Sequence, residues 1–332
     1  MTVQAFFYDA EGHDREIGID EVKVDAISER TLLWIDLEAA TSDESARIVE
    51  LLEIGSVSAL ACEVDEDAGT IQNFGGHITV CLALPEQRDI SGRSEEESSH
   101  ARDNEFLTFV ISERWLVTSH SGKAPLFEKF RDKDKAETGI GALSPASLAA
   151  ALMDWHLGLF FEAASGIATE VDSLDERVLR DKANKSLLGR IVTLRRKTSR
   201  LRAALVTNRP VIYGLQRPDV AIISQSDATT HYSVLAARFE RAIDEIERVR
   251  DLINGSFDLF ASRSGLQTNA LVKTLTVVTA VFGYFAAVAG LFGMNLKSSL
   301  FNGGDGAFAA IVGTLTATSV LAVIFARSRK WI

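Results

Sequence analysis

Ionisable side chains, which bind bare cations or relay protons inside membranes, are nearly absent from the two longest apolar runs of this 332-residue sequence. Residues 271–292 contain Lys273 as their only charge, residues 306–326 contain none, and neither run has Asp, Glu or His. A proton pump or a carrier of bare cations would bury such groups at mid-membrane. Their absence favours a pore through which an ion passes with its water attached. Two helices per chain cannot enclose a pore, so several copies must assemble.

Both runs have the length of a membrane span. They comprise 22 and 21 residues, and about 20 apolar residues cross a hydrocarbon core of ~30 Å as a helix; a pair of buried core helices is the alternative. Arg327, Arg329 and Lys330 follow the second run, so the positive-inside rule places this tail, residues 327–332, in the cytoplasm. The N-terminus lacks a signal peptide. We therefore expect an integral inner (plasma) membrane protein with two spans, cytoplasmic termini and an outer loop at residues 293–305.

Charge and motifs exclude other classes of function. The net charge is -11, and residues 1–110 alone carry 25 acidic against 7 basic side chains, so nucleic acid is not an expected partner. The sequence shows no phosphate-binding loop and no nucleophile elbow, and its 6 histidines form no His-x-x-x-His pair. The chain is therefore not expected to be an enzyme.

The N-terminal part, residues 1–143, alternates strand-like and helix-like segments. Strands rich in Val, Ile, Leu, Phe and Thr are predicted at residues 3–8, 32–37, 78–84 and 106–119. Thr41 or Ser42 would cap a helix that has Glu44 in its first turn. We expect a cytoplasmic α/β domain.

A helical domain, residues 144–270, follows. Helices are predicted at residues 146–182, 186–208 and 230–292. In the last of these, apolar residues recur at steps of three and four: Leu235, Phe239, Ala242, Ile246, Val249, Ile253, Phe257 and Phe260. No proline interrupts this heptad-like seam, which predicts a long stalk helix at about residues 230–270. The stalk should continue into the first membrane helix, residues 271–292, so that the soluble part is mechanically joined to the span.

Several local motifs resemble those of one known family. They are Gly293-Met294-Asn295 in the context AGLFGMNL, Asn269-Ala-Leu-Val-Lys273-Thr-Leu275-Thr276 at the inner end of the first span, and the terminal Arg329-Lys330-Trp331-Ile332. With two C-terminal spans after a long stalk, they resemble the CorA family of divalent-cation channels, including its ZntB branch. The resemblance implies a funnel-shaped homopentamer in the lipid bilayer, lined by the first membrane helix.

The resemblance also implies roles for individual residues. The selectivity filter would be Gly293, Met294 and Asn295. A ring of Asn295 amide oxygens could hydrogen-bond to the waters of a hydrated dication, and a polar helix end is the alternative for Asn295. The pore-lining face would comprise Asn269, Val272, Leu275, Thr279, Gly283, Ala286 and Gly290. Within it, Val272 and Leu275 would form an apolar collar that gates by dewetting.

Carboxylates of the cytoplasmic part are candidates for sensing the transported ion, as in many members of the family. They are Glu63, Asp65, Glu66 and Asp67 in the N-terminal domain and Asp244, Glu245, Glu247, Asp251 and Asp258 on the stalk. No motif singles out a pair, and a solvated helix face is the alternative for the stalk acids. No cofactor is expected apart from the divalent cation, which would be both substrate and regulator.

Departures from the family pattern bear on the identity of the ion. Gly283-Tyr284 stands where many members have a proline beside a bulky apolar residue. The outer loop carries Lys297, has Asp305 as its only acid, and lacks both the Met-Pro-Glu-Leu stretch of magnesium transporters and the Gly-Ile-Pro stretch of the zinc branch. We favour Mg²⁺, with Co²⁺ and Ni²⁺ as further substrates and gating by cytoplasmic dication. The alternatives are a ZntB-like Zn²⁺ transporter, with or without proton coupling, and a non-conducting membrane-anchored sensor or scaffold.

Overall fold

The chain forms two compact units. Unit 1 comprises Met1–Asp172 and Ile191–Asn254, and unit 2 comprises Ser173–Arg190 and Gly255–Ile332. The structure, a computed structural model, describes residues 3–11, 14–22, 24, 27–28, 31–56, 60, 69–85, 106–120, 127, 139–181, 184–294 and 304–329.

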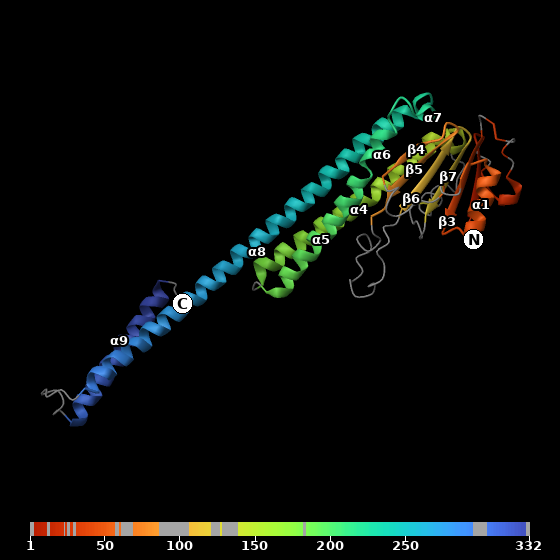
Figure 1. Cartoon of the computed structure of the whole chain (residues 1–332). Helices are drawn as coiled ribbons and strands as arrows, with labels where there is room; N and C mark the ends of the chain where they lie inside the picture. Colours follow the sequence, from red (N-terminus) through yellow and green to blue (C-terminus); the bar gives the residue numbers. More distant parts are fainter. Residues whose placement is uncertain are drawn as a thin grey trace. The chain divides into compact units, whose positions relative to one another are not determined.

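A mixed β-sheet lies at the N-terminal end of unit 1 (Figure 1). Within the described residues it has seven strands, in the order β2-β1-β3-β7-β6-β5-β4. The strands are β1 (Val3–Asp9), β2 (Arg15–Ile17), β3 (Thr31–Glu38), β4 (Ile71–Asn73), β5 (His77–Ala83), β6 (Phe106–Ser112) and β7 (Trp115–His120). The β3–β7 pair is parallel, and the other neighbouring pairs are antiparallel. The prediction of an α/β domain is confirmed.

Strand β3 is buried on both faces, which explains why its sequence is a nearly continuous apolar run. On one face Leu33 belongs to the same hydrophobic cluster as Ile48 of α1 (Ser42–Leu51). On the other face Trp34 meets Phe127 edge to face, with 5.5 Å between the ring centroids. Strand β3 is thus an interior strand of the sheet, between β1 and β7.

The helix predicted near Thr41 is confirmed, and Thr41 is its N-cap. The Thr41 hydroxyl accepts a hydrogen bond from the backbone N–H of Glu44 at 3.3 Å. In return the Glu44 carboxylate accepts one from the backbone N–H of Thr41 at 2.8 Å. This reciprocal capping box satisfies two backbone donors at the start of α1.

The single strand predicted at residues 106–119 is wrong, because this run forms the hairpin of β6 and β7. The Ser112 hydroxyl accepts hydrogen bonds from the backbone N–H groups of Arg114, at 3.1 Å, and Trp115, at 3.2 Å, and so stabilises the turn. The segments on both sides of the turn are equally apolar, so the pattern does not mark the reversal. The strands β2 and β4 were not predicted, because three residues are too few for a recognisable alternation.

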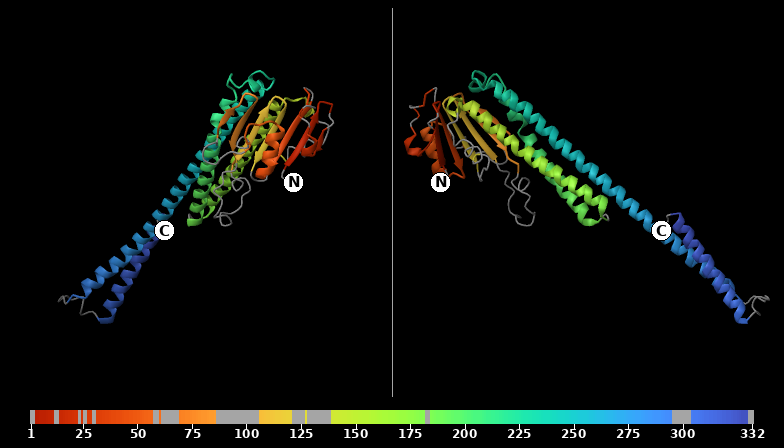
Figure 2. Two further views of the ribbon diagram at one scale, coloured as in Figure 1. Left: turned by 45° about the vertical axis from the view of Figure 1, so that its right-hand side comes forward. Right: turned by 180° about the vertical axis from the view of Figure 1, so that it is seen from behind.

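Long helices complete unit 1. They are parts of α4 (Pro145–Arg180), α5 (Lys185–Thr207) and α8 (Thr229–Phe292), with the short helices α6 (Arg209–Gly214) and α7 (Ala221–Ser224) between them. Figures 1 and 2 show α4, α5 and the first part of α8 side by side. The predicted seam is buried here: its members from Leu235 to Ile253 are at most 2% exposed, whereas Phe257 in unit 2 is 47% exposed. The long uninterrupted helix is confirmed.

Asn208, between α5 and α6, joins these helices to the edge of the sheet. Its Nδ2 donates to the carbonyl oxygen of Ala83 at 2.9 Å, and its Oδ1 accepts from the N–H of Ala83 at 2.7 Å. His156 of α4 lies beside it, with Nε2 3.5 Å from Asn208 Nδ2. Complete burial lowers the pKa of His156 to about 4, so its imidazole is neutral at physiological pH.

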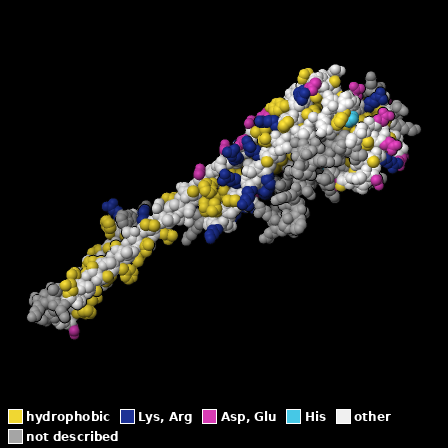
Figure 3. All heavy atoms as spheres, in the orientation of Figure 1, with side chains coloured by type: hydrophobic (Ala, Val, Ile, Leu, Met, Phe, Trp, Pro, Cys, Tyr) yellow, Lys and Arg dark blue, Asp and Glu magenta, His cyan; other side chains and the backbone are white. Residues whose placement is uncertain are grey.

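Unit 2 contains two helices that are long and apolar enough to cross a membrane. They are α9 (Gly304–Ser328), of 25 residues, and the C-terminal part of α8, which has 64 residues in all. The most apolar window of each is unburied, and Figure 3 shows hydrophobic side chains in patches along this segment. The core helix of a soluble protein would bury such side chains. The two candidate spans are therefore where the sequence predicts them.

Candidate ion pathway and acidic face of helix α8

All seven residues predicted to line a pore are exposed on α8: Asn269, Val272, Leu275, Thr279, Gly283, Ala286 and Gly290. The two apolar members near the inner end are prominent, since Val272 is 55% and Leu275 65% exposed. Val277, Val281 and Val288, on another face of the same segment, are half-buried. The predicted face is thus not used for packing within the chain, and it is available to surround an axis.

Beyond the collar, the predicted face carries small side chains. Thr279, Gly283, Ala286 and Gly290 follow Leu275 toward the outer end of α8, at steps of three and four residues. Steps of this size keep residues on one side of a helix. Such a face has no carboxylate or imidazole that could replace the water ligands of a cation, and it is suited to a water-filled passage.

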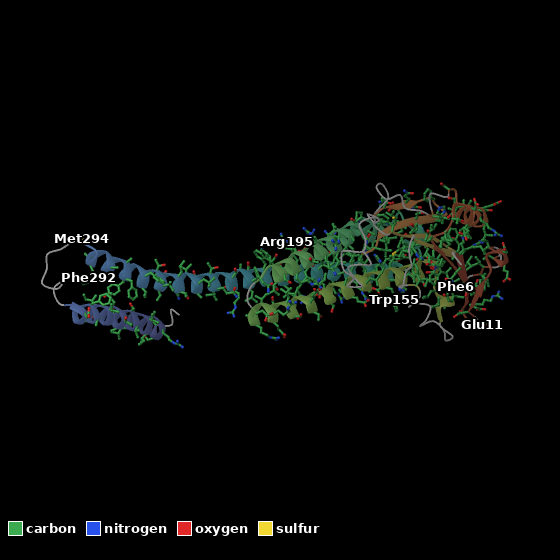
Figure 4. All side chains as sticks on the ribbon, turned by 90° about the horizontal axis from the view of Figure 1, so that it is seen from below. Phe6, Glu11, Trp155, Arg195, Phe292 and Met294 are labelled. Atoms are coloured by element: carbon green, nitrogen blue, oxygen red, sulfur yellow. The ribbon has the colours of Figure 1, made fainter. Side chains whose placement is uncertain are left out.

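Helix α8 ends at Phe292, and the predicted filter motif begins at the next residue (Figure 4). The N–H of Gly293 still donates to the carbonyl of Ala289 at 2.8 Å, and the N–H of Met294 to the carbonyl of Leu291 at 3.4 Å. The Met294 side chain is 54% exposed. Asn295 lies outside the described residues. Gly293 and Met294 therefore place the start of the motif at the last turn of the candidate span.

Two of the candidate regulatory acids are engaged by arginines. Arg248 Nε donates to Glu245 at 3.0 Å, and this hydrogen bond lowers the pKa of Glu245. Glu247 pairs with Arg202 of α5 and accepts from Arg250 at 2.7 Å; the hydrogen bond from Arg202 is the main cause that lowers its pKa. A dication bound at either carboxylate would have to compete with these guanidinium groups.

The other stalk candidates have a different environment. Asp244, Asp251 and Asp258 are all exposed and follow one another at seven-residue intervals on α8. A seven-residue interval repeats one face of a helix, so the three carboxylates form an acidic stripe. In the described part of the chain, no group of three or more His, Cys, Asp or Glu side chains could hold a metal ion. The candidates Glu63, Asp65, Glu66 and Asp67 lie outside that part.

A buried polar cluster in the sheet was not predicted. The Thr118 hydroxyl donates to Asp36 Oδ1 at 2.5 Å and accepts a hydrogen bond from Trp34 Nε1 at 3.0 Å. His120 Nε2 lies 3.3 Å from the same Asp36 oxygen. Asp36 is 4% and Thr118 0% exposed. The cluster links β3 and β7 by side-chain hydrogen bonds and is buried from solvent. Its signal in the sequence is an acid within the apolar run Trp34-Ile35-Asp36-Leu37.

A groove between the membrane part of α8 and α9 was not predicted either. Its volume is about 460 Å³, and small residues such as Ala280 and Ala322 line it. Tyr284 stands at one end, where its hydroxyl lies 3.3 Å from Thr318 Oγ1. In the sequence, the groove is indicated only by small side chains that recur at helical spacing on both helices. A groove can be recognised only once the two helices are known to pair.

One protein family, described as CorA-like Mg²⁺ transporter protein, matches residues 29–327 of the chain. The cobalt/magnesium transport protein CorA of Methanocaldococcus jannaschii is 24% identical over 330 residues, covering 95% of this chain and 96% of that protein. The cobalt/magnesium transport protein CorA of Thermotoga maritima is 22% identical over 238 residues, covering 71% of this chain and 67% of that protein.

Solved structures share the fold over the whole chain. The complete structure of the CorA magnesium transporter from Methanocaldococcus jannaschii has a TM-score of 0.76 and 18% sequence identity, covering 100% of both chains. The full-length CmaX protein has a TM-score of 0.71 and 18% identity, covering 99% of this chain and 98% of that one. The order of sheet domain, long helix and two C-terminal apolar helices is thus the same in these proteins.

Proposed function

The chain belongs to the family of CorA-like Mg²⁺ transporter proteins and is a divalent-cation transporter, and from this premise we propose that it is a homopentameric channel for hydrated Mg²⁺. The channel would also admit Co²⁺ and Ni²⁺. It would lie in the inner membrane with both termini in the cytoplasm and α8 lining the pore. The observation that carries the proposal is the exposed stripe of seven residues from Asn269 to Gly290 on α8, none of which is ionisable.

The proposed passage suits an ion that keeps its hydration shell. Mg²⁺ exchanges its waters reluctantly, so a site that strips them would slow the ion. A ring of Asn295 amides at the outer end would hydrogen-bond to those waters, with Gly293 and Met294 holding it in place. Farther in, the small side chains of the pore face leave room for water, and Asn269 adds a polar ring just inside the collar.

Opening of the channel would be regulated by the cytoplasmic part of the same helix. Asp244, Asp251 and Asp258 are exposed, and among the described residues none of them has an arginine partner of the kind that Glu245 and Glu247 have. Brought together by several copies of the chain, such acidic stripes repel one another, and bound dications offset the repulsion. A high internal dication concentration would then favour the closed state, and its loss would favour the open one.

A Zn²⁺ transporter of the ZntB type is the second candidate. The outer loop leaves this candidate open, because Lys297 stands near the mouth and Asp305 is the only acid there, which weakens the attraction of Mg²⁺ and Zn²⁺ alike. Against it, Zn²⁺ prefers nitrogen and sulfur ligands, which the described pore face does not offer.

We expect radiotracer flux into proteoliposomes of the purified protein to be higher for Mg²⁺ than for Zn²⁺, with Co²⁺ and Ni²⁺ also carried. The reason is that neutral oxygen atoms interact with the waters of each ion but give Zn²⁺ no preferred ligand. Protein-free liposomes are the control. A preference for Zn²⁺ that depends on a proton gradient would favour the second candidate. Absence of flux for all four ions, with folded protein, would indicate a non-conducting sensor or scaffold.

Native mass spectrometry of the protein in a mild detergent is expected to show five copies. Two candidate spans per chain cannot enclose a passage, so several copies must surround it, and the resemblance to the CorA family implies five. The same preparation should be tested for flux after reconstitution. Monomers or dimers as the only species, in a preparation that retains flux, would contradict the pentamer.

A further inference from the structure

The groove between α8 and α9 has the depth of one lipid leaflet. Figures 1 and 2 show the two helices side by side, and the contact of Tyr284 with Thr318 fixes their antiparallel register. Lys273 precedes Tyr284 by eleven residues and Arg329 follows Thr318 by eleven, so these two cations stand level with each other. At 1.5 Å per residue the lining, from Thr276 to Tyr284, is about 12 Å long, and the length from Tyr284 to the level of Lys273 is about 16 Å. This is close to half of a hydrocarbon core of ~30 Å.

The lining of the groove is mostly apolar, and its polar groups are the hydroxyls of Thr276, Tyr284, Thr318 and Ser319. Ala280 of α8 and Ala322 and Ala326 of α9 keep it hollow, at a volume of about 460 Å³. The hydroxyls of Thr276 and Thr318 donate to the carbonyl four residues earlier on their own helices, at 2.8 and 2.9 Å. Both hydroxyls are thus satisfied by their own backbone, whereas the buried Ser319 Oγ has no hydrogen-bond partner among the described residues. The rest of the lining is carbon. A hydrocarbon chain matches such a surface.

Two cations flank one end of the groove. Lys273 lies one helical turn before the lining residue Thr276, and Arg329 lies one turn after Ala326. The guanidinium of Arg329 lies 5.6 Å from the centroid of the Phe325 ring, which itself lines the groove. Basic pockets between membrane helices on the cytoplasmic side bind anionic lipid head groups. The apolar groove and the basic end together match a lipid with a negatively charged head.

The groove is separate from the pore face. With 100° per residue, Val277, Ala280, Val281 and Tyr284 lie on average about 135° round the helix from the middle of the stripe that contains Val272 and Leu275, while Thr276 lies at the border of that stripe. A transmembrane helix from a second copy would run the full span of about 20 residues, but the groove stops at Tyr284. A half-span groove therefore favours an acyl chain over a neighbouring helix.

We propose that this groove seats one acyl chain of an anionic phospholipid whose phosphate is bound by Lys273 and Arg329. The bound lipid would wedge between α8 and α9 and fix the distance between the pore-lining helix and its partner. Assignment of the lipid to the cytoplasmic leaflet rests on the proposed topology of the two spans. Binding itself does not, so it can be tested in the absence of flux.

The test is native mass spectrometry of the full-length protein titrated with phosphatidylglycerol or with phosphatidylcholine of the same acyl chains. We expect phosphatidylglycerol to bind more tightly. Arg329→Gln and Lys273→Gln should each weaken it about fivefold, the effect of ~1 kcal/mol per basic residue, and leave phosphatidylcholine unchanged. Arg327→Gln is the matched control, because it removes the same charge about 160° round the helix; it should change the affinity less than twofold. Equal binding of the two lipids, or an equal loss in Arg327→Gln, would overturn the proposal.

A second pair of variants tests the groove rather than its charge. Ala322→Phe fills the groove and should abolish tight binding of phosphatidylglycerol while the oligomer stays assembled. Ala317→Phe places the same side chain on another face of α9 and should bind the lipid as the wild type does. If Ala322→Phe dissociates the oligomer and Ala317→Phe does not, the groove is a contact between copies of the chain, and the lipid site is refuted.

Discussion

Replacement of Asn295 by alanine is expected to lower Mg²⁺ flux by at least about tenfold while the oligomer remains intact. The substitution removes one amide from every subunit at once. Each hydrogen bond between an amide and a water of the hydrated ion is worth roughly 1 kcal/mol, and only ~1.4 kcal/mol is needed for a tenfold change. Helix α8 ends at Phe292, and Gly293 and Met294 still bond to its last turn, so the substitution lies beyond the end of the helix.

Asn302→Ala is the matched control, because it makes the same chemical change seven residues farther along the outer loop. It should retain wild-type flux. Asn295→Asp should have a different effect: a ring of carboxylates holds the dication itself, so passage slows and the preference among Mg²⁺, Co²⁺ and Ni²⁺ changes. Flux and selectivity of the wild type in both Asn295 variants, measured with radiotracers in proteoliposomes, would show that the filter lies elsewhere.

The parts of the fold that follow from periodicity were predictable from the sequence. The seam from Leu235 to Ile253 is buried as its three-four spacing implies, and α8 is unbroken because no proline occurs in it. The reversal between β6 and β7 was not predictable from hydrophobicity, since it depends on the local hydrogen bonds of Ser112. Local hydrogen bonds of this kind leave only a weak compositional signal.

The candidate site divides in the same way. The pore face of α8 is a property of one helix, and its spacing alone places Val272 beside Leu275. Which of the stalk acids are free to bind a dication is not a property of one helix, because Glu247 pairs with Arg202, which is 45 residues away in the chain. Likewise the groove requires the meeting of Tyr284 with Thr318, 34 residues apart. Features made by two helices need their pairing, and single-helix patterns do not supply it.

Replacement of Leu275 by serine is expected to raise Mg²⁺ flux at least about tenfold at an internal Mg²⁺ concentration that closes the wild type. Leu275 is 65% exposed on the pore face, and Val272, three residues earlier, is 55% exposed. A ring of branched apolar side chains in a narrow passage excludes water, and a dication that keeps its hydration shell cannot cross a dry segment. Burial of a leucine side chain contributes ~1.5–3 kcal/mol, and a change of ~1.4 kcal/mol already shifts the open-to-closed ratio tenfold.

Leu271→Ser is the matched control, because it distinguishes the loss of a gate from a general destabilisation of the helix. Leu271 is on the same helix, is 71% exposed, and loses the same apolar surface, but it lies about 100° round the helix from Val272. It should close with internal Mg²⁺ as the wild type does. The acidic stripe of Asp244, Asp251 and Asp258 stays intact in both variants, so dication sensing is unchanged and only the collar differs. The measurement is flux across a titration of internal Mg²⁺. If Leu275→Ser closes at the same concentration and to the same extent as Leu271→Ser, the collar is not the gate, and closure must occur at another ring of α8.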